Sequence, residues 1–213
     1  MTDRSAPSAL LRAHPVIAVL RAAAATDYDP VVDTLAENGV RSIELTLTTP
    51  GTFEHLPALA ARLGSAAEIG VGTVLTAEQA QRAIDAGAAY LVTPVTLPDV
   101  IAVAVRNGVP VFPGGLTPGE LFTGWQAGAT AVKVFPAETV GPKYGAHLRG
   151  PFPELEFVPS GGVALDDIPA WLQAGALAVS LGGPLVGDAF KGGSLTALGE
   201  RARRASELAT LAR

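Results

Sequence analysis

The chain contains no cysteine among its 213 residues and has only three histidines. The absence of cysteine excludes disulfide bonds, zinc–thiolate sites and thiol nucleophiles. His14, His55 and His147 are scattered, so no two of them have the spacing that places metal ligands on one helix face. We therefore expect no metal site and no bound cofactor.

Long apolar runs and clusters of basic residues are also missing. No apolar segment reaches the roughly 20 residues that span a bilayer, and Asp3, Arg4 and Pro7 interrupt any signal-peptide pattern. The formal net charge is −5, without a basic run, which argues against nucleic acid or an anionic membrane as a partner. We expect a soluble cytoplasmic protein.

Apolar residues, in contrast, make up 48% of the chain and charged residues only 16%. This composition is sufficient for a core buried on two levels, and the length fits a single domain over residues 1–213. Short apolar segments alternate with helical ones, several of which end at glycine, the usual helix stop. The expected strands are Val16–Leu20, Ser42–Leu47, Glu68–Leu75, Tyr90–Pro94, Val109–Gly114, Ala131–Pro136, Glu156–Gly161 and Ala178–Gly182.

Eight strands that alternate with helices predict parallel pairing, because each return to the sheet needs a crossover. A closed barrel and an open doubly wound sheet both fit this pattern. The strand count and the absence of Gly-x-Gly-x-x-Gly before the first helix favour a single α/β domain, a (β/α)8 TIM barrel. We expect a short N-terminal helix before Pro15 to cap the barrel, and a final helix from Ser194 onward.

Lysine is rare, with only Lys133, Lys143 and Lys191 in the chain. Lys133 lies in the apolar segment Ala131–Pro136, which has no acidic residue. Burial there disfavours the ammonium form, and a neutral lysine amine is a nucleophile toward carbonyl groups. The alternative is a lysine that reaches solvent at the strand end or pairs with an acid across the barrel.

A glutamate in the second expected strand adds to this prediction. Alternation along Ser42–Leu47 places Glu44, Thr46 and Thr48 on one face, which we expect to point into the barrel. A buried carboxylate beside a buried amine can carry the protons that Schiff-base chemistry requires. A static buried ion pair is the alternative interpretation.

Two glycine-rich segments follow the last two expected strands. Such loops in barrels commonly bind phosphate or another anion through backbone N–H groups, although glycine also suits tight turns. We predict an anion site formed by Ser160, Gly161, Gly162, Gly182 and Gly183.

Two other polar residues lie at or near the carboxyl ends of expected strands. Thr73 can donate to a substrate carboxylate, or act as a capping or core threonine. Arg21 follows the first strand and can bind a carboxylate or phosphate with two hydrogen bonds, or lie on the surface.

Several motifs in order resemble the KDPG/KHG aldolases, that is, the 2-keto-3-deoxy-6-phosphogluconate and 4-hydroxy-2-oxoglutarate aldolases. The likeness extends from about Pro15 to Val186, nearly the whole expected barrel. The motifs that carry it are Ile43–Leu47, Gly70–Leu75, Thr93–Pro94, Lys133–Glu138 and Pro159–Gly162.

The resemblance implies a metal-free class I aldolase, usually a homotrimer. It implies Lys133 as the Schiff-base lysine, Glu44 as the proton shuttle and Thr73 as a contact to the pyruvate carboxylate. It also implies that Pro94 and Phe135 shape the pocket, and that Gly161 and Gly162 belong to the phosphate-binding loop. The expected reaction cleaves a 2-keto-3-deoxy-4-hydroxy acid, such as 2-keto-3-deoxy-6-phosphogluconate or a related 2-keto acid, to pyruvate and an aldehyde.

The chain departs from the family pattern at two positions. Thr48 stands where the common pattern has an arginine that binds the pyruvyl carboxylate, and Arg21 matches an arginine that some members carry instead. Gly183 stands where the last phosphate loop typically has a serine. Two alternatives stay open: a phosphosugar isomerase or epimerase on the same barrel with Glu44 as base, and, on the basis of these departures, a non-catalytic barrel that binds an anionic metabolite.

Overall fold

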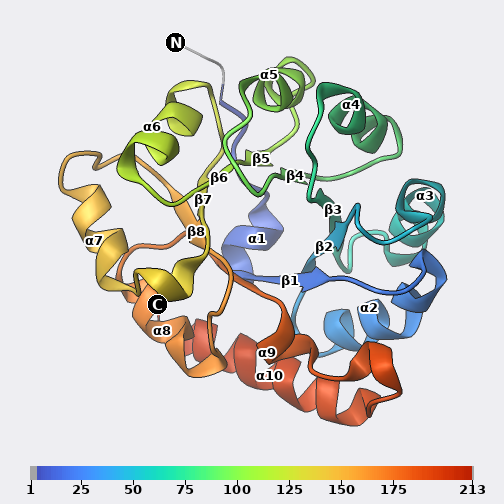
Figure 1. Ribbon diagram of the computed structural model, residues 1–213. Helices are drawn as coiled ribbons and strands as arrows, with labels where there is room; N and C mark the ends of the chain where they lie inside the picture. The colour runs from blue at the N-terminus through green and yellow to red at the C-terminus, as the bar shows by residue number, and fades with distance from the viewer. Residues whose placement is uncertain (1–3, 213) are drawn as a thin grey trace.

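The computed structural model describes residues 4–212, with parallel strands at the centre and helices outside them (Figure 1). The strands form a six-stranded sheet, ordered β5-β4-β3-β2-β1-β9, and a three-stranded sheet, ordered β6-β7-β8. Their bounds are β1 Val16–Leu20, β2 Ser42–Thr46, β3 Glu68–Gly72, β4 Leu91–Val92, β5 Val111–Phe112, β6 Gly114–Gly115, β7 Val132–Val134, β8 Phe157–Pro159 and β9 Val179–Leu181.

The helices start where the sequence supplies capping residues. The side chain of Thr76 accepts a hydrogen bond from the Gln79 N–H ahead of α4, and Thr117 and Glu120 form a capping box at α6. The α-helices are α1 Ala9–Ala13, α2 Tyr28–Glu37, α3 Thr52–Leu63, α4 Ala77–Asp85, α5 Pro98–Arg106, α6 Pro118–Gln126, α7 Lys143–Arg149, α8 Ile168–Gln173, α9 Gly183–Val186 and α10 Leu195–Leu211. Four 3₁₀ helices are described as well: η1 Ala25–Asp27, η2 Ala137–Thr139, η3 Leu165–Asp167 and η4 Ala189–Lys191.

A proline divides one of the expected strands. Val109–Gly114 was expected as one strand, but β5 and β6 are separated by Pro113, which has no N–H to donate. The carbonyl of Pro113 still accepts a hydrogen bond of 2.8 Å from the Lys133 N–H. The parallel α/β arrangement is confirmed. The backbone pairing forms two sheets, and an isolated parallel bridge between Ser160 and Ser180 links the β8 edge of one sheet to the β9 edge of the other.

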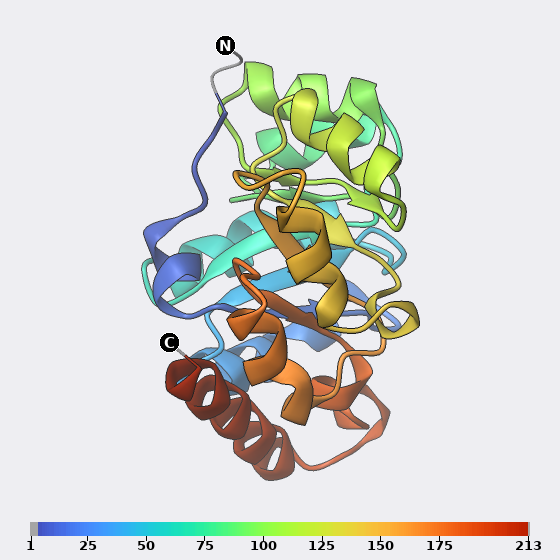
Figure 2. The same ribbon diagram turned by 90° about the vertical axis from the view of Figure 1, so that its left-hand side faces the viewer.

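Two apolar clusters fill the molecule. The larger one packs the outward faces of the strands against the helices. The smaller one lies between the strands and includes Ile17, Tyr90 and Phe112, together with Leu11 from α1. Leu11 is 1% exposed, and α1 lies across the amino ends of the strands (Figure 2). The expected N-terminal capping helix is therefore present.

The residues before α1 extend toward α6. The Arg4 guanidinium lies 3.2 Å from the centroid of the Trp125 ring and donates a 2.8 Å hydrogen bond to the Trp125 carbonyl. The other tryptophan, Trp171, is buried against Phe157. None of the helices in the described part of the chain combines the length and apolar character of a membrane span.

Candidate active site

Lys133 lies in the middle of β7, with Gly114 of β6 and Val158 of β8 as its register partners. Val132 and Val134 pack outward against the helices, so alternation turns Lys133 into the space between the strands. The residue is 8% exposed. Its Nζ lies 5.0 Å from the centroid of the Phe135 ring, which is within range of a cation–π interaction.

Glu44 points into the same interior space from β2, because Ile43 and Leu45 face the helices. It is 2% exposed. Burial raises the pKa of Glu44, while the positive charges of Lys133 and, more weakly, Arg21 act to lower it. A carboxyl group whose pKa is raised by burial beside a positive charge is suited to taking up and releasing protons.

Glycine in β3 provides the space that the Glu44 side chain occupies. An added Cβ on Gly72 would lie 1.8 Å from Glu44 Oε1 and 2.4 Å from Cδ, so the carboxylate lies directly over this glycine. The sequence identified Gly70–Leu75 as a family motif, but it did not show that a glycine is needed there to leave space for Glu44. Any larger residue at position 72 would displace the carboxylate.

The structure joins Arg21 to the two threonines of β2 and its following loop. Arg21 Nε donates a 2.9 Å hydrogen bond to Thr48 Oγ1, which in turn shares a 3.0 Å hydrogen bond with Thr46 Oγ1. Thr46 Oγ1 also bonds to the Leu20 carbonyl at 3.0 Å. The terminal nitrogens of Arg21 make no hydrogen bond to any described residue. An exposed guanidinium is thus fixed at Thr48 with donors that can bind an anion.

Thr73 and Pro94 follow the carboxyl ends of β3 and β4. Thr73 has a φ of 60° and is half-buried, so it adopts a left-handed conformation that non-glycine residues rarely take. The Pro94 carbonyl lies against Gly114, where an added Cβ would be 2.3 Å from the Pro94 oxygen. Both residues occupy the end of the strands at which active sites of barrel proteins lie.

The glycine-rich segment after β8 packs against the residues that follow β7. Gly161 and Gly162 have φ values of 86° and 74°, and an added Cβ on Gly161 would lie 2.9 Å from the Phe135 ring. On Gly162 it would lie 2.1 Å from Glu138 Oε2. Sequence reasoning did not anticipate this exposed carboxylate beside the expected anion loop.

Ser160 and the segment after β9 complete the set of predicted residues. Ser160 Oγ donates a 3.2 Å hydrogen bond to Ser180 Oγ, and both serines are buried. Gly182 precedes α9 and Gly183 begins it. An added Cβ on Gly183 would meet no atom within 4 Å, so this position has room for a side chain.

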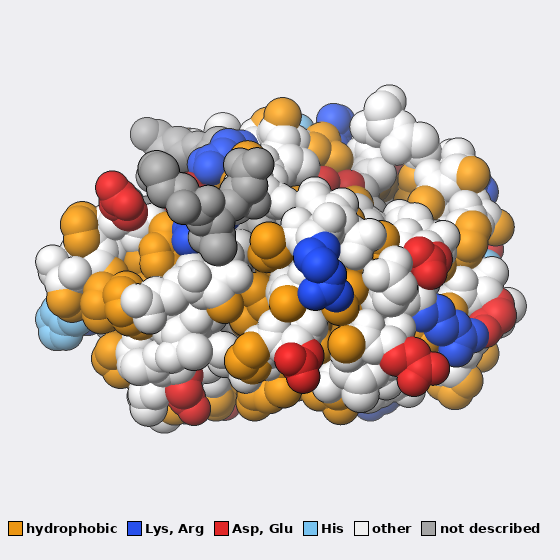
Figure 3. Space-filling view, turned by 90° about the horizontal axis from the view of Figure 1, so that it is seen from above, with side chains coloured by type: hydrophobic (Ala, Val, Ile, Leu, Met, Phe, Trp, Pro, Cys, Tyr) orange, Lys and Arg blue, Asp and Glu red, His pale blue; other side chains and the backbone are white. Residues whose placement is uncertain are grey.

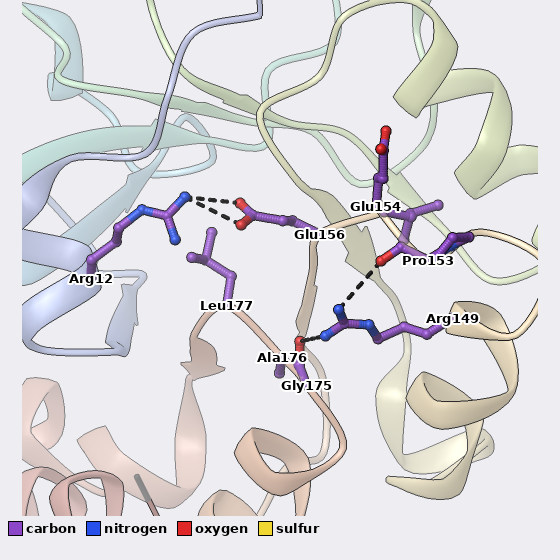
Figure 4. Close-up of a pocket in the computed structure, with 9 residues that line it drawn as sticks. Arg12, Arg149, Pro153, Glu154, Glu156, Gly175, Ala176 and Leu177 are labelled. Atoms are coloured by element: carbon purple, nitrogen blue, oxygen red, sulfur yellow. Dashed lines mark hydrogen bonds and ion pairs between the residues drawn. The ribbon is translucent and has the colours of Figure 1, made fainter.

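A hollow of about 600 Å³ lies at the opposite end of the strands (Figure 4). Glu156 and Leu177, which line it, come just before β8 and β9. Arg12 pairs with Glu156 at 3.2 Å, and the Arg149 guanidinium donates to the carbonyls of Pro153 and Gly175. These charged groups are already engaged with protein atoms, and the hollow is separate from Lys133.

Charged side chains of both signs are interspersed with apolar and uncharged ones on the face shown in Figure 3. Within residues 4–212, no three His, Asp or Glu side chains are grouped closely enough to bind a metal ion.

A buried lysine and a buried glutamate that face one interior of a parallel α/β fold, with an exposed arginine after β1, are compatible with the class of enzymes that form a Schiff base with a carbonyl substrate. Comparison with known proteins identifies the particular group. The chain matches the KDPG and KHG aldolase family over residues 8–198, and it belongs to that family.

Individual relatives agree. The 2-dehydro-3-deoxy-6-phosphogalactonate aldolase of Escherichia coli K12 is 34% identical over 172 residues, which cover 80% of this chain and 84% of that protein. The solved "Native KDPGal structure" aligns with a TM-score of 0.86 at 31% identity, over 93% of this chain and 95% of that one. A Legionella pneumophila KDPG aldolase, solved with pyruvate captured at low pH as a covalent carbinolamine intermediate, aligns with a TM-score of 0.85 at 27% identity, over 93% and 97%.

The chain is therefore a class I aldolase, a carbon–carbon lyase that forms pyruvate and an aldehyde through a Schiff base. The predicted family and reaction are confirmed. An isomerase or epimerase and a non-catalytic barrel, the two alternatives, are set aside by this membership.

Proposed function

We propose that Lys133 is the amine that forms the Schiff base, and that Glu44 carries protons to and from the reacting atoms. The observation that supports this most is that both buried side chains project into one space between the strands. Of the positive charges that lower the pKa of Glu44, that of Lys133 has the larger effect.

The reaction starts when Glu44 takes a proton from Lys133, and the free amine attacks C2 of a 2-keto-4-hydroxy acid. The carbinolamine hydroxyl receives a proton from Glu44 and leaves as water, which produces an iminium ion. Removal of the C4 hydroxyl proton then breaks the C3–C4 bond, and its electron pair moves into the iminium group. An aldehyde is released and an enamine remains. Protonation at C3 and hydrolysis give pyruvate and free Lys133.

We further propose that Arg21 binds the substrate carboxylate together with Thr48. The hydrogen bond between them holds the guanidinium next to the position where the family pattern has an arginine. Thr73 donates to the same carboxylate, Thr46 fixes Thr48, and Pro94 and Phe135 line the pyruvyl pocket.

For the other half of the substrate we propose a 6-phosphorylated 2-keto-3-deoxy sugar acid, of the phosphogluconate or phosphogalactonate type for which the relatives are named. Its phosphate would lie on backbone N–H groups of the two glycine-rich segments. These segments contain Ser160, Gly161, Gly162, Gly182 and Gly183.

Two structural expectations remain part of the proposal. We propose that the two sheets act as one closed (β/α)8 barrel, since β5 and β6 adjoin at Pro113 and Ser160 bridges to Ser180. We also propose a cytoplasmic homotrimer, as the family resemblance implies. Light scattering on the purified protein would give three times the 21.6 kDa chain mass if the trimer forms.

Borohydride trapping tests the central proposal. Reduction in the presence of pyruvate should attach a reduced pyruvyl group to the peptide that contains Lys133, and not to those with Lys143 or Lys191. Lys133→Ala should abolish both trapping and pyruvate release, whereas Lys143→Ala serves as the matched control and should retain both. An unmodified Lys133 peptide from active enzyme would contradict the proposal.

A further inference from the structure

Tyr90 has a buried hydroxyl without a hydrogen-bond partner among the described residues. The residue immediately precedes β4, is 2% exposed and packs against Phe112 with 5.5 Å between the ring centroids. A phenylalanine would satisfy the same apolar contacts. Because a buried hydroxyl that lacks a partner is costly, this group requires an explanation beyond packing.

Two glycines of β3 show how Tyr90 and Glu44 are related. An added Cβ on Gly70 would lie 2.1 Å from Tyr90 Cε2 and 2.3 Å from Cζ, and on Gly72 it would lie 1.8 Å from Glu44 Oε1. Residues two apart on a strand face the same side. The Tyr90 ring and the Glu44 carboxylate therefore cross the same strand at successive interior positions, from opposite neighbouring strands.

Strand register gives the direction of the tyrosine side chain. Gly70 is the register partner of Glu44 on one side. On its other side, the Val71 N–H donates to the Tyr90 carbonyl at 3.0 Å, and the Ala89 N–H donates to the Ile69 carbonyl at 2.8 Å. Tyr90 is thus level with Gly70 and Glu44. A ring that crosses β3 from there carries its hydroxyl toward the base of the Glu44 side chain.

The charges around the hydroxyl agree with this geometry. Burial raises the pKa of Tyr90 well above its usual value, and the carboxylates of Glu68 and Glu44 raise it further. Glu68 is one position earlier on the interior face of β3, where it accepts a 2.6 Å hydrogen bond from Ser42. The hydroxyl therefore remains protonated, with its donor hydrogen available to the negative charges of these two carboxylates.

We propose that Tyr90 is a positioning residue for Glu44. Its buried hydroxyl, which has no hydrogen-bond partner among the described residues, points toward the Glu44 side chain, and the O–H dipole favours the ionised form of the Glu44 carboxylate that accepts protons. Tyr90 does not touch the substrate and acts only through Glu44. The inference rests on the proton-transfer role of Glu44 proposed above.

Tyr90→Phe removes the hydroxyl and leaves the ring in place. Loss of the O–H dipole favours protonated Glu44, so the acidic limb of the kcat–pH profile should move up by about one pH unit. At pH values below that limb, kcat of the variant should be about tenfold lower than that of wild type, and it should recover at higher pH. KM should be unchanged. A purely structural hydroxyl would change thermal stability without moving the limb. Tyr144→Phe is the matched control, because Tyr144 lies in α7 and its hydroxyl donates to the Leu116 carbonyl ahead of α6.

An unshifted acidic limb in Tyr90→Phe would overturn the inference. Borohydride trapping of pyruvate separates this outcome from failure of the proposed function. Wild-type protein that is not trapped at Lys133 contradicts the Schiff-base role, whereas normal trapping with an unshifted limb contradicts only the role of Tyr90. Should Tyr90→Phe not fold, 3-fluorotyrosine at position 90 keeps the hydroxyl and makes it a stronger donor. The limb should then move to lower pH, and an unchanged limb would again overturn the inference.

Discussion

Gly72→Ala is expected to inactivate the enzyme by displacing Glu44, although neither residue 72 nor its new methyl group takes part in the chemistry. The added Cβ would lie 1.8 Å from Glu44 Oε1, where ordinary contacts begin at 3.4 Å, so the oxygen must move by about 1.6 Å (3.4 − 1.8). Gly72 does not have a positive φ, so alanine is compatible with the backbone and the effect is steric.

A displacement of this size in a proton-transfer group is expected to lower kcat about 100-fold. The overpacked interior should also lose about 1–3 kcal/mol of the free energy of unfolding. The assay is pyruvate release from a 2-keto-3-deoxy-6-phospho acid, with circular dichroism to verify folding and borohydride trapping to verify that Lys133 remains reactive.

Gly119→Ala is the matched control, since an added Cβ there meets nothing within 4 Å and kcat should be unchanged. A folded Gly72→Ala protein with wild-type kcat would refute the reasoning, because the carboxylate over Gly72 would then be dispensable or free to move without loss.

Three further substitutions test other parts of the site. Glu44→Gln should lower kcat by about 10²–10⁴-fold. Because burial raises the pKa of Glu44, the wild-type protein loses stability as the pH rises from the pKa of the unfolded state through the raised pKa of the folded state. Thermal melts should therefore show that the variant becomes more stable relative to wild type over this pH range and equals it in acid. Arg21→Gln should raise KM for the 2-keto acid at least tenfold with a smaller change in kcat, and equal KM values would remove Arg21 from carboxylate binding. Gly183→Ser adds a hydroxyl where there is room, so KM for phosphorylated substrates should fall about tenfold and that for unphosphorylated ones should not; equal effects on both would place the phosphate elsewhere.

The parallel α/β arrangement and the inward direction of Lys133 and Glu44 could be predicted because both depend on local alternation. Each lies between two apolar residues that need the helix-facing side, so the polar residue must take the other side. The interruption of the expected strand at Pro113 was harder to predict. The chain continues in the same direction after the proline, and only the neighbouring strands show that β5 and β6 pair in different sheets.

Contacts between distant residues account for what sequence reasoning missed. The resemblance connects Arg21 and Thr48 through one carboxylate-binding role, but only the fold shows the 2.9 Å hydrogen bond between them. Tyr90 was expected as the start of a strand, without a role, because its significance depends on Gly70 and on the register with β2. The contact of Glu138 with Gly162 depends on a loop conformation that no local pattern specifies.

Leu11 has a consequence for the order in which products leave. Because α1 covers the amino end of the interior with this side chain, a substrate is expected to reach Lys133 from the carboxyl ends of the strands. In the proposed reaction the carbon bound to Lys133 would then lie deeper than the fragment beyond the broken bond. The aldehyde is therefore expected to leave first and pyruvate last.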